Sequence, residues 1–242
     1  MPALTPAAHL RPVPAKPFQT RRGRRSERGF TLAELALVLF IIALLGGSLL
    51  VPLGSRVEAR DRQLTLERLR DIQHALSGFA IIHGRLPCAS TEADPLSPHY
   101  GLEDAAPCSF ASEGRLPWRT LGMPAHDAWG SPRRQPQDDW AGHWRYRVDP
   151  EFATGPIDAA TLPTANLQIR ALDDTRITTS TSQAVAIVYS TGPNRSADGY
   201  NAAYSAASPV YQAGEAGAGF DDLLVWIGRP LLVARLAQAG RL

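Results

Sequence analysis

The residue with the clearest chemical consequence is Glu34, a single carboxylate inside a long apolar run. Residues 30–53 (FTLAELALVLFIIALLGGSLLVPL) contain no other charged side chain. A charge at bilayer depth costs roughly 3 kcal/mol or more, so acids in such runs are rare and usually have a partner and a function. The sequence therefore predicts a specific partner for Glu34; the alternative is an acid that reaches to the membrane interface and has no partner.

Side chains that could support catalysis follow no catalytic or metal-binding pattern. The six histidines show no H-x-x-x-H or H-E-x-x-H spacing, and the chain has no G-x-S-x-G, P-loop or G-x-G-x-x-G. Asp138, Asp139 and His143 are close in sequence but belong to a polar stretch, where a solvated surface is the default. We expect a protein that is not an enzyme.

Charge is distributed unevenly between the N-terminal segment and the rest of the chain. Residues 1–29 carry seven basic side chains and one acidic one, about +6, whereas residues 30–242 carry 18 and 22, about −4. Arginines just before a long apolar run hold that end in the cytoplasm and send the remainder across the membrane. The remainder has no basic patch typical of nucleic-acid binding.

One long helix is predicted to connect the apolar run to the rest of the protein. Residues 30–53 would span roughly 36 Å as a helix, enough to cross the hydrocarbon core. Pro52 and Gly54 predict a kink or local melting there. Residues 54–86 then resume helical periodicity with one apolar face, and Gly84 and Pro87 are stop signals.

The remaining residues, 87–242, indicate one globular domain. Residues 87–136 are rich in loops and contain Cys88 and Cys108. In an extracytoplasmic compartment these favour a disulfide, although two buried thiols are the alternative.

Four short β-like runs predict a small antiparallel sheet, and a terminal amphipathic helix is predicted from Arg229 onward. These runs cover residues 144–148, 167–172, 184–190 and 222–228. The predicted fold class is α+β, with the long helix packed on the sheet.

The segment RGFTLAELALVLFIIALLGG resembles the N-terminus of type IV prepilins and type II secretion pseudopilins. This resemblance implies that a prepilin peptidase removes residues 1–29 as a leader by cutting after Gly29, and that it methylates the new N-terminal Phe30. Cleavage creates an α-amino group about 6 Å along the helix from Glu34. In a staggered filament that amine can meet the carboxylate of a neighbouring subunit, so the resemblance assigns filament assembly to Glu34. Pro52 lies where many members have a helix-weakening proline.

Two further segments resemble parts of the major pseudopilins. DAWG (residues 127–130) is similar to their DPWG stretch, and YSTGPNRSADG with FDDLLVW is similar to a later loop that binds calcium in those relatives. Oxygen-rich loops suit Ca²⁺, and the resemblance gives four candidate ligands. They are Ser190, Asp198, Asp221 and Asp222. The alternative is that these residues only form turns. No cofactor is required, and calcium is the one ion that the sequence suggests.

Together these features predict a minor pilin-like (pseudopilin) subunit of a type II secretion or type IV pilus filament. The expected partners are prepilin peptidase, other pilin or pseudopilin subunits and an inner-membrane assembly platform. The protein would cross the inner membrane once, with its N-terminus cytoplasmic and its globular domain periplasmic. The alternative is a single-pass, signal-anchored periplasmic protein with an enzymatic or sensory domain that is not processed at Gly29.

Overall fold

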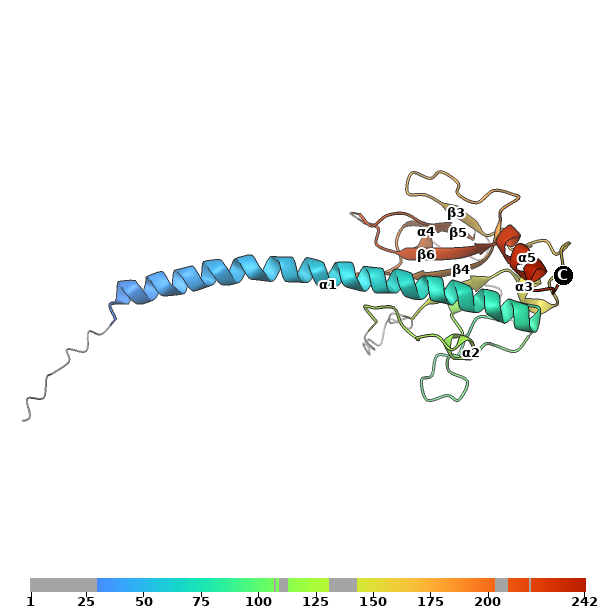
Figure 1. The fold of residues 1–242 in the computed structure, drawn as a ribbon, viewed down its shortest axis with the longest axis horizontal. Coiled ribbons are helices and arrows are strands. Elements are labelled where there is room, and N and C mark those ends of the chain that lie inside the picture. Colours follow the sequence, from blue (N-terminus) through green and yellow to red (C-terminus); the bar gives the residue numbers. More distant parts are fainter. Residues whose placement is uncertain (1–29, 107, 109–112, 131–142, 203–208, 218) are drawn as a thin grey trace, which may run out of the picture. The chain divides into compact units, whose positions relative to one another are not determined.

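The structure is a computed structural model of the chain. It does not describe residues 1–29, 107, 109–112, 131–142, 203–208 and 218, nor the side chains of residues 45–53. The described residues form an α+β fold, in which a long helix is followed by a mainly antiparallel set of strands (Figure 1). The predicted fold class is confirmed to that extent. Two compact units are present, Met1–Leu50 and Val51–Leu242.

The long helix α1 covers Leu32–His83, close to the predicted range 30–83. The helix continues through Pro52 without interruption, so the predicted local melting does not occur. It ends where Gly84, with φ of +71°, donates its amide hydrogen to the main-chain oxygen of Ala80. A positive φ suits glycine, which has no Cβ, and this explains why the helix stops there.

A membrane span is not shown by the structure. Where side chains are described, no helix combines the length and the apolar character that a crossing requires. Residues 45–53, the second part of the predicted span 30–53, lie outside the described side chains.

Four strands form the main sheet of the second unit, in the order β1–β2–β4–β6, and every pairing is antiparallel. The strands are β1 (Gly114–Arg115), β2 (Arg145–Val148), β4 (Ala184–Ser190) and β6 (Leu223–Gly228). Three of the four predicted β-like runs therefore become strands of this sheet. β1 was not predicted, because two residues give no periodic signal.

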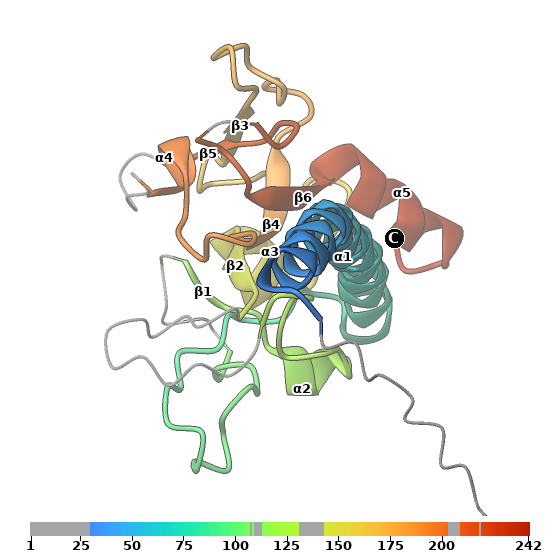
Figure 2. The same cartoon turned by 90° about the vertical axis from the view of Figure 1, so that its left-hand side faces the viewer.

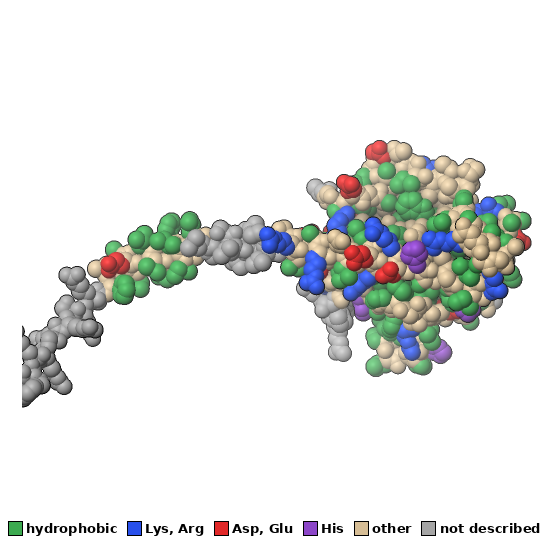
Figure 3. All heavy atoms as spheres, viewed as in Figure 1, with side chains coloured by type: hydrophobic (Ala, Val, Ile, Leu, Met, Phe, Trp, Pro, Cys, Tyr) green, Lys and Arg blue, Asp and Glu red, His purple; other side chains and the backbone are tan. Residues whose placement is uncertain are grey.

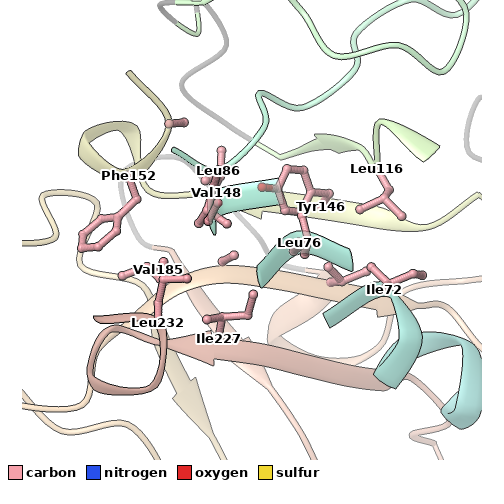
Figure 4. Packing of buried hydrophobic residues seen from close by; sticks show 14 of the residues in the cluster. Ile72, Leu76, Leu86, Leu116, Tyr146, Val148, Phe152, Val185, Ile227 and Leu232 are labelled. Atoms are coloured by element: carbon pink, nitrogen blue, oxygen red, sulfur yellow. The ribbon is translucent and has the colours of Figure 1, made fainter. Parts of the chain in front are cut away.

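The main core lies between this sheet and the second half of α1. Leu69, Ile72 and Leu76 recur at helical spacing and are fully buried. They belong to one core cluster with side chains such as Tyr146 and Val185 from β2 and β4, and Figure 4 shows Ile72 and Leu76 within this cluster. Burial of each large apolar side chain contributes about 1.5–3 kcal/mol, so this face fixes the helix on the sheet.

A second, two-stranded sheet pairs β3 (Gln168–Arg170) with β5 (Val210–Gln212) in parallel. Here the prediction was wrong: the run at residues 167–172 is not a strand of the antiparallel sheet, although the isolated bridge Leu167–Ala184 and side-chain packing connect it to β4. The reason lies in β4, which is buried at every position. One of its faces contacts the core under α1, and the other contacts Ile169 and Tyr211 of the small sheet.

Short helices and the disulfide complete this unit. The helices are α2 (Trp118–Leu121), α3 (Pro150–Thr154), α4 (Gly199–Ala202) and α5 (Arg229–Gln238). α5 confirms the predicted terminal helix and lies beside the second half of α1 (Figure 2). The disulfide Cys88–Cys108 is present, as predicted, with Cα atoms 5.4 Å apart.

Candidate functional site

The start of α1 is organised by hydrogen bonds between Thr31 and Glu34. The Thr31 amide and hydroxyl each donate to Glu34 Oε2 at 2.9 Å, and the Glu34 amide donates to Thr31 Oγ1 at 3.2 Å. The main-chain oxygen of Thr31 accepts the first intrahelical bond, from Leu35. This reciprocal arrangement is a capping box, with Thr31 as N-cap and Glu34 three residues later.

The capping box places the Glu34 carboxylate beside the beginning of the helix. Its oxygen accepts from the amide of Thr31, which is the next residue after Phe30. Phe30 is described and highly exposed, whereas Gly29 lies outside the described residues. Chemically, the carboxylate can stabilise positive charge near Phe30. The T-x-x-E spacing before an apolar run is the sequence signal for this cap, which was not predicted.

The described part of the first unit exposes apolar side chains on all sides. Ten large hydrophobic side chains from Phe30 to Leu44 are exposed, and Figure 3 shows hydrophobic side chains (green) along the visible face of this segment. An amphipathic helix of a soluble domain would carry a polar stripe instead. A surface of this kind is stable only when lipid or other protein covers it.

A second candidate site consists of three carboxylates in the globular unit. Asp198 precedes α4, and Asp221 and Asp222 precede β6, yet oxygens of all three lie within 4.8 Å of one another. Backbone amides hold them there: the Asp221 amide donates to Asp198 Oδ2 at 2.8 Å, and the Asp198 amide donates to Asp222 Oδ2 at 3.0 Å. The structure thus brings together three of the four predicted calcium ligands.

The electrostatics of this acidic cluster (Asp198, Asp221 and Asp222) fit a cation. Burial raises the pKa of Asp221 and of Asp222 to about 6, and repulsion from Asp198 adds to both shifts. Asp221 Oδ1 and Asp222 Oδ1 are buried and accept no hydrogen bond from the described residues. Unpartnered, buried carboxylate oxygens are hard ligands of the type that Ca²⁺ prefers. The donor set therefore fits calcium.

Ser190, the fourth predicted ligand, makes a different contact. Its hydroxyl donates to Asp127 Oδ2 and accepts from the amide of Gly192. Asp127 is the first residue of DAWG, and that segment is tied to α1, because the Ala128 amide donates to Thr65 Oγ1 at 3.1 Å. The two pseudopilin-like segments are thus neighbours in space, and DAWG connects α1 to the end of β4 through the buried side chain of Asp127.

Comparison with known proteins identifies the N-terminal segment. A family model described as the prokaryotic N-terminal methylation motif matches residues 24–50. The match confirms the prepilin-type motif recognised in the sequence, and it is consistent with a type IV pilin-like or pseudopilin protein. No curated protein and no solved structure matches the chain.

Proposed function

We propose that this protein, which carries a prepilin-type N-terminal methylation motif, is a minor pseudopilin or pilin subunit of a type II secretion or type IV pilus filament. The observation that carries the proposal is the match at residues 24–50, which includes Gly29, Phe30 and Glu34. The long helix followed by a small antiparallel sheet also supports the proposal. The first half of such a helix is apolar and would serve assembly, and the second half packs on the globular domain.

The proposed maturation begins in the inner membrane. Prepilin peptidase cuts after Gly29 on the cytoplasmic side and methylates Phe30, and residues 30–53 cross the bilayer with the globular unit in the periplasm. The exposed apolar side chains between Phe30 and Leu44 support this placement, because lipid would cover them before assembly. In the filament, the same surface is covered by the helices of neighbouring subunits.

Glu34 is proposed to guide that assembly. In the unassembled chain its carboxylate is occupied by Thr31 through the capping box, so it is not left without a partner. In the filament, the new α-amine of an adjacent subunit becomes its counter-ion. Pairing two charges in a low-dielectric environment relieves both desolvation penalties together, which makes the contact specific for one register.

Further features support a minor subunit that acts by assembly and not by catalysis. The globular unit carries a long loop region closed by Cys88–Cys108. Similarity of DAWG and of the loop around Asp198 to major pseudopilins favours the secretion filament over the pilus. The proposed partners are prepilin peptidase, other pilin-like subunits and the inner-membrane assembly platform.

We also propose that the acidic cluster binds calcium. Support comes from the three carboxylates within 4.8 Å and from the buried, unpartnered oxygens of Asp221 and Asp222. Bound Ca²⁺ would neutralise their mutual repulsion and hold the loop before α4 against the start of β6. Asp198, Asp221 and Asp222 would supply carboxylate oxygens.

The N-terminal peptide of the mature protein tests the central proposal. The full chain is recovered from host membranes, and its N-terminal peptide is measured by mass spectrometry. A peptide that begins with N-methylated Phe30 is the expected result, and a bulky replacement of Gly29 serves as the control that retains the leader. An intact leader in the unaltered chain, or a cut near Ser48, would instead favour a signal-anchored periplasmic protein.

A further inference from the structure

Asn201 lies between the acidic cluster and the small parallel sheet. It is the third residue of α4 and only 1% exposed. Its side-chain Nδ2 donates to Asp222 Oδ2 at 2.8 Å and to the main-chain oxygen of Gln212 at 3.1 Å. Its Oδ1 accepts from the amide of Gln212 at 2.8 Å. All three contacts are buried or partly buried, so solvent does not replace them readily.

In this arrangement the side-chain amide of Asn201 pairs with the main chain of Gln212 as a residue of a neighbouring strand would. A primary amide offers the same donor and acceptor as a peptide group, and Asn201 uses both on Gln212, the last residue of β5. The second Nδ2 hydrogen goes to Asp222. The orientation of the amide is therefore determined, because a flipped amide would place its oxygen against a carboxylate and a carbonyl.

The backbone just before Asn201 lies close to Gln212 of β5. Gly199 has a φ of +50°, and a Cβ added there would lie 1.9 Å from Gln212 Oε1. The positive φ favours glycine at this position, and any larger residue would also displace the end of the Gln212 side chain. The Asn201 amide donates to the main-chain oxygen of Asp198 at 2.9 Å, so the residue that holds Gln212 is also attached to the acidic cluster.

On its other side, β5 connects to the main sheet through a buried carboxylate. Tyr211 of β5 donates its hydroxyl to Glu113 Oε2 at 3.0 Å, while Tyr189 of β4 donates to Glu113 Oε1 at 2.9 Å. The position of β5 thus affects how the small sheet packs on β4. A change at Asn201 would reach the packing of the two sheets through Gln212 and Tyr211.

We infer that Asn201 is a positioning residue that couples cation occupancy of the acidic cluster to the docking of β5. This inference rests on the proposed calcium site. A cation that holds the Asp222 carboxylate also fixes Nδ2 of Asn201, and the same amide group then holds the backbone of Gln212. Without the cation, repulsion among the three carboxylates weakens the hold on Asp222, and Asn201 then holds the backbone of Gln212 less firmly. Coupling is reciprocal, so weaker docking of β5 also lowers cation affinity.

Amide hydrogen exchange provides the test, because the Gln212 amide donates directly to Asn201. The full chain in detergent is compared in CaCl₂ and in EGTA, with calorimetry to measure Ca²⁺ binding. We expect Ca²⁺ to slow exchange in peptides that contain residues 210–213 by about tenfold, within the range of measured coupling. In Asn201→Ala this Ca²⁺-dependent slowing should disappear while binding remains, weakened several-fold.

Asn194→Ala is the matched control. Asn194 also contacts the cluster: its side-chain Nδ2 donates to Asp198 at 3.3 Å and its main-chain amide donates to Asp221 at 3.3 Å, but among the described residues it forms no hydrogen bond with β5. Protection of β5 by Ca²⁺ should persist in this variant. Tyr211→Phe, which leaves the cluster intact, should lower Ca²⁺ affinity and keeps the test valid if Asn201→Ala does not fold.

The possible failures are distinguishable. Calorimetric binding of Ca²⁺ without slower exchange at residues 210–213 in the unaltered chain would overturn the coupling and leave the calcium site in place. No binding at all would overturn the calcium site and the coupling with it, but not the assignment as a pilin-like subunit, which rests on the N-terminal peptide.

Discussion

Ser190 donates its hydroxyl hydrogen to Asp127 across 63 positions of sequence, with Oγ and Oδ2 2.5 Å apart. Both side chains are buried. The other Asp127 oxygen accepts from the amide of Trp129 at 3.0 Å. Burial raises the pKa of Asp127, whereas these hydrogen bonds act in the opposite direction. Ser190 therefore stabilises a buried carboxylate at the joint between β4 and DAWG.

Ser190→Ala should destabilise the globular unit. The substitution leaves Asp127 Oδ2 without its hydroxyl donor, and an unsatisfied buried acceptor costs about 1–3 kcal/mol. Urea unfolding of the full chain in detergent, followed by tryptophan fluorescence, measures the change. Ser180→Ala at an exposed position is the control and should change stability by less than about 0.5 kcal/mol. Equal effects of the two variants would show that the contact contributes nothing.

Glu34→Leu should be cleaved and membrane-inserted but should enter filaments poorly. Leaving a buried amine without its counter-ion costs ~3–5 kcal/mol, which reduces incorporation by about a hundredfold or more. Thr31→Ala separates the two roles of the carboxylate, because it removes both hydrogen bonds of the Thr31 hydroxyl in the capping box and keeps the charge of Glu34. Filament content of each variant, measured relative to total processed protein, is the readout. Normal incorporation of Glu34→Leu would contradict an assembly role.

The sequence predicted α1 and the central strands because their signals are local. Helical spacing of Leu69, Ile72 and Leu76 indicates a buried helix face, and the unbroken apolar run at β4 indicates a strand covered on both sides. The proximity of Asp198 to Asp221 was reached through resemblance to a family and not through spacing. Twenty-two residues lie between the two aspartates, and no local sequence pattern predicts a contact over that separation.

The contacts missed by sequence reasoning are those between distant short segments. β5 has only three residues, so periodicity cannot identify it. It pairs in parallel with β3, and both strands pack on the second face of β4. That face exists only once the main sheet has formed, so a local sequence pattern cannot reveal the pairing. Asn201 carries no signal of its own, because an asparagine in a loop more often forms a turn than an amide bridge to a strand.

Arg241→Ala should weaken the end of α1. Arg241 donates from Nε and from its terminal nitrogen to the main-chain oxygens of Ile81 and Ile82, both at 2.5 Å. These carbonyls belong to the last turn of the helix, where a cation is favourable, typically by about 0.3–1 kcal/mol at an exposed site. We expect a loss of that size in urea unfolding and faster amide exchange near His83. Arg176→Ala, also at an exposed position, should show neither effect.

Cys88→Ser with Cys108→Ser should lower stability by about 3 kcal/mol, the value expected when a loop of this length is no longer closed in the unfolded chain. The measurement is the urea midpoint of the double variant against the oxidised protein. Reduction of the unaltered chain with dithiothreitol should reproduce the loss and should have no effect on the double variant. A midpoint that is unchanged by either treatment would contradict a stabilising role for the disulfide.

Stability in EGTA should fall as the pH rises from about 4 to about 7. The pKa of Asp222 is raised to about 6 in the folded chain, compared with about 3.9 for an unfolded aspartate. Protonation is therefore favoured in the folded state, so its contribution is complete below about pH 4 and lost as the pH passes the folded pKa.

Asp222→Asn should flatten this dependence, whereas Asp158→Asn, an exposed residue whose pKa is lowered, should not. CaCl₂ should restore stability at the higher pH in the unaltered chain but not in Asp222→Asn, since the cation then takes the place of the proton. A stability that rises over this interval in EGTA would contradict both the raised pKa and the repulsion on which the proposed calcium site depends.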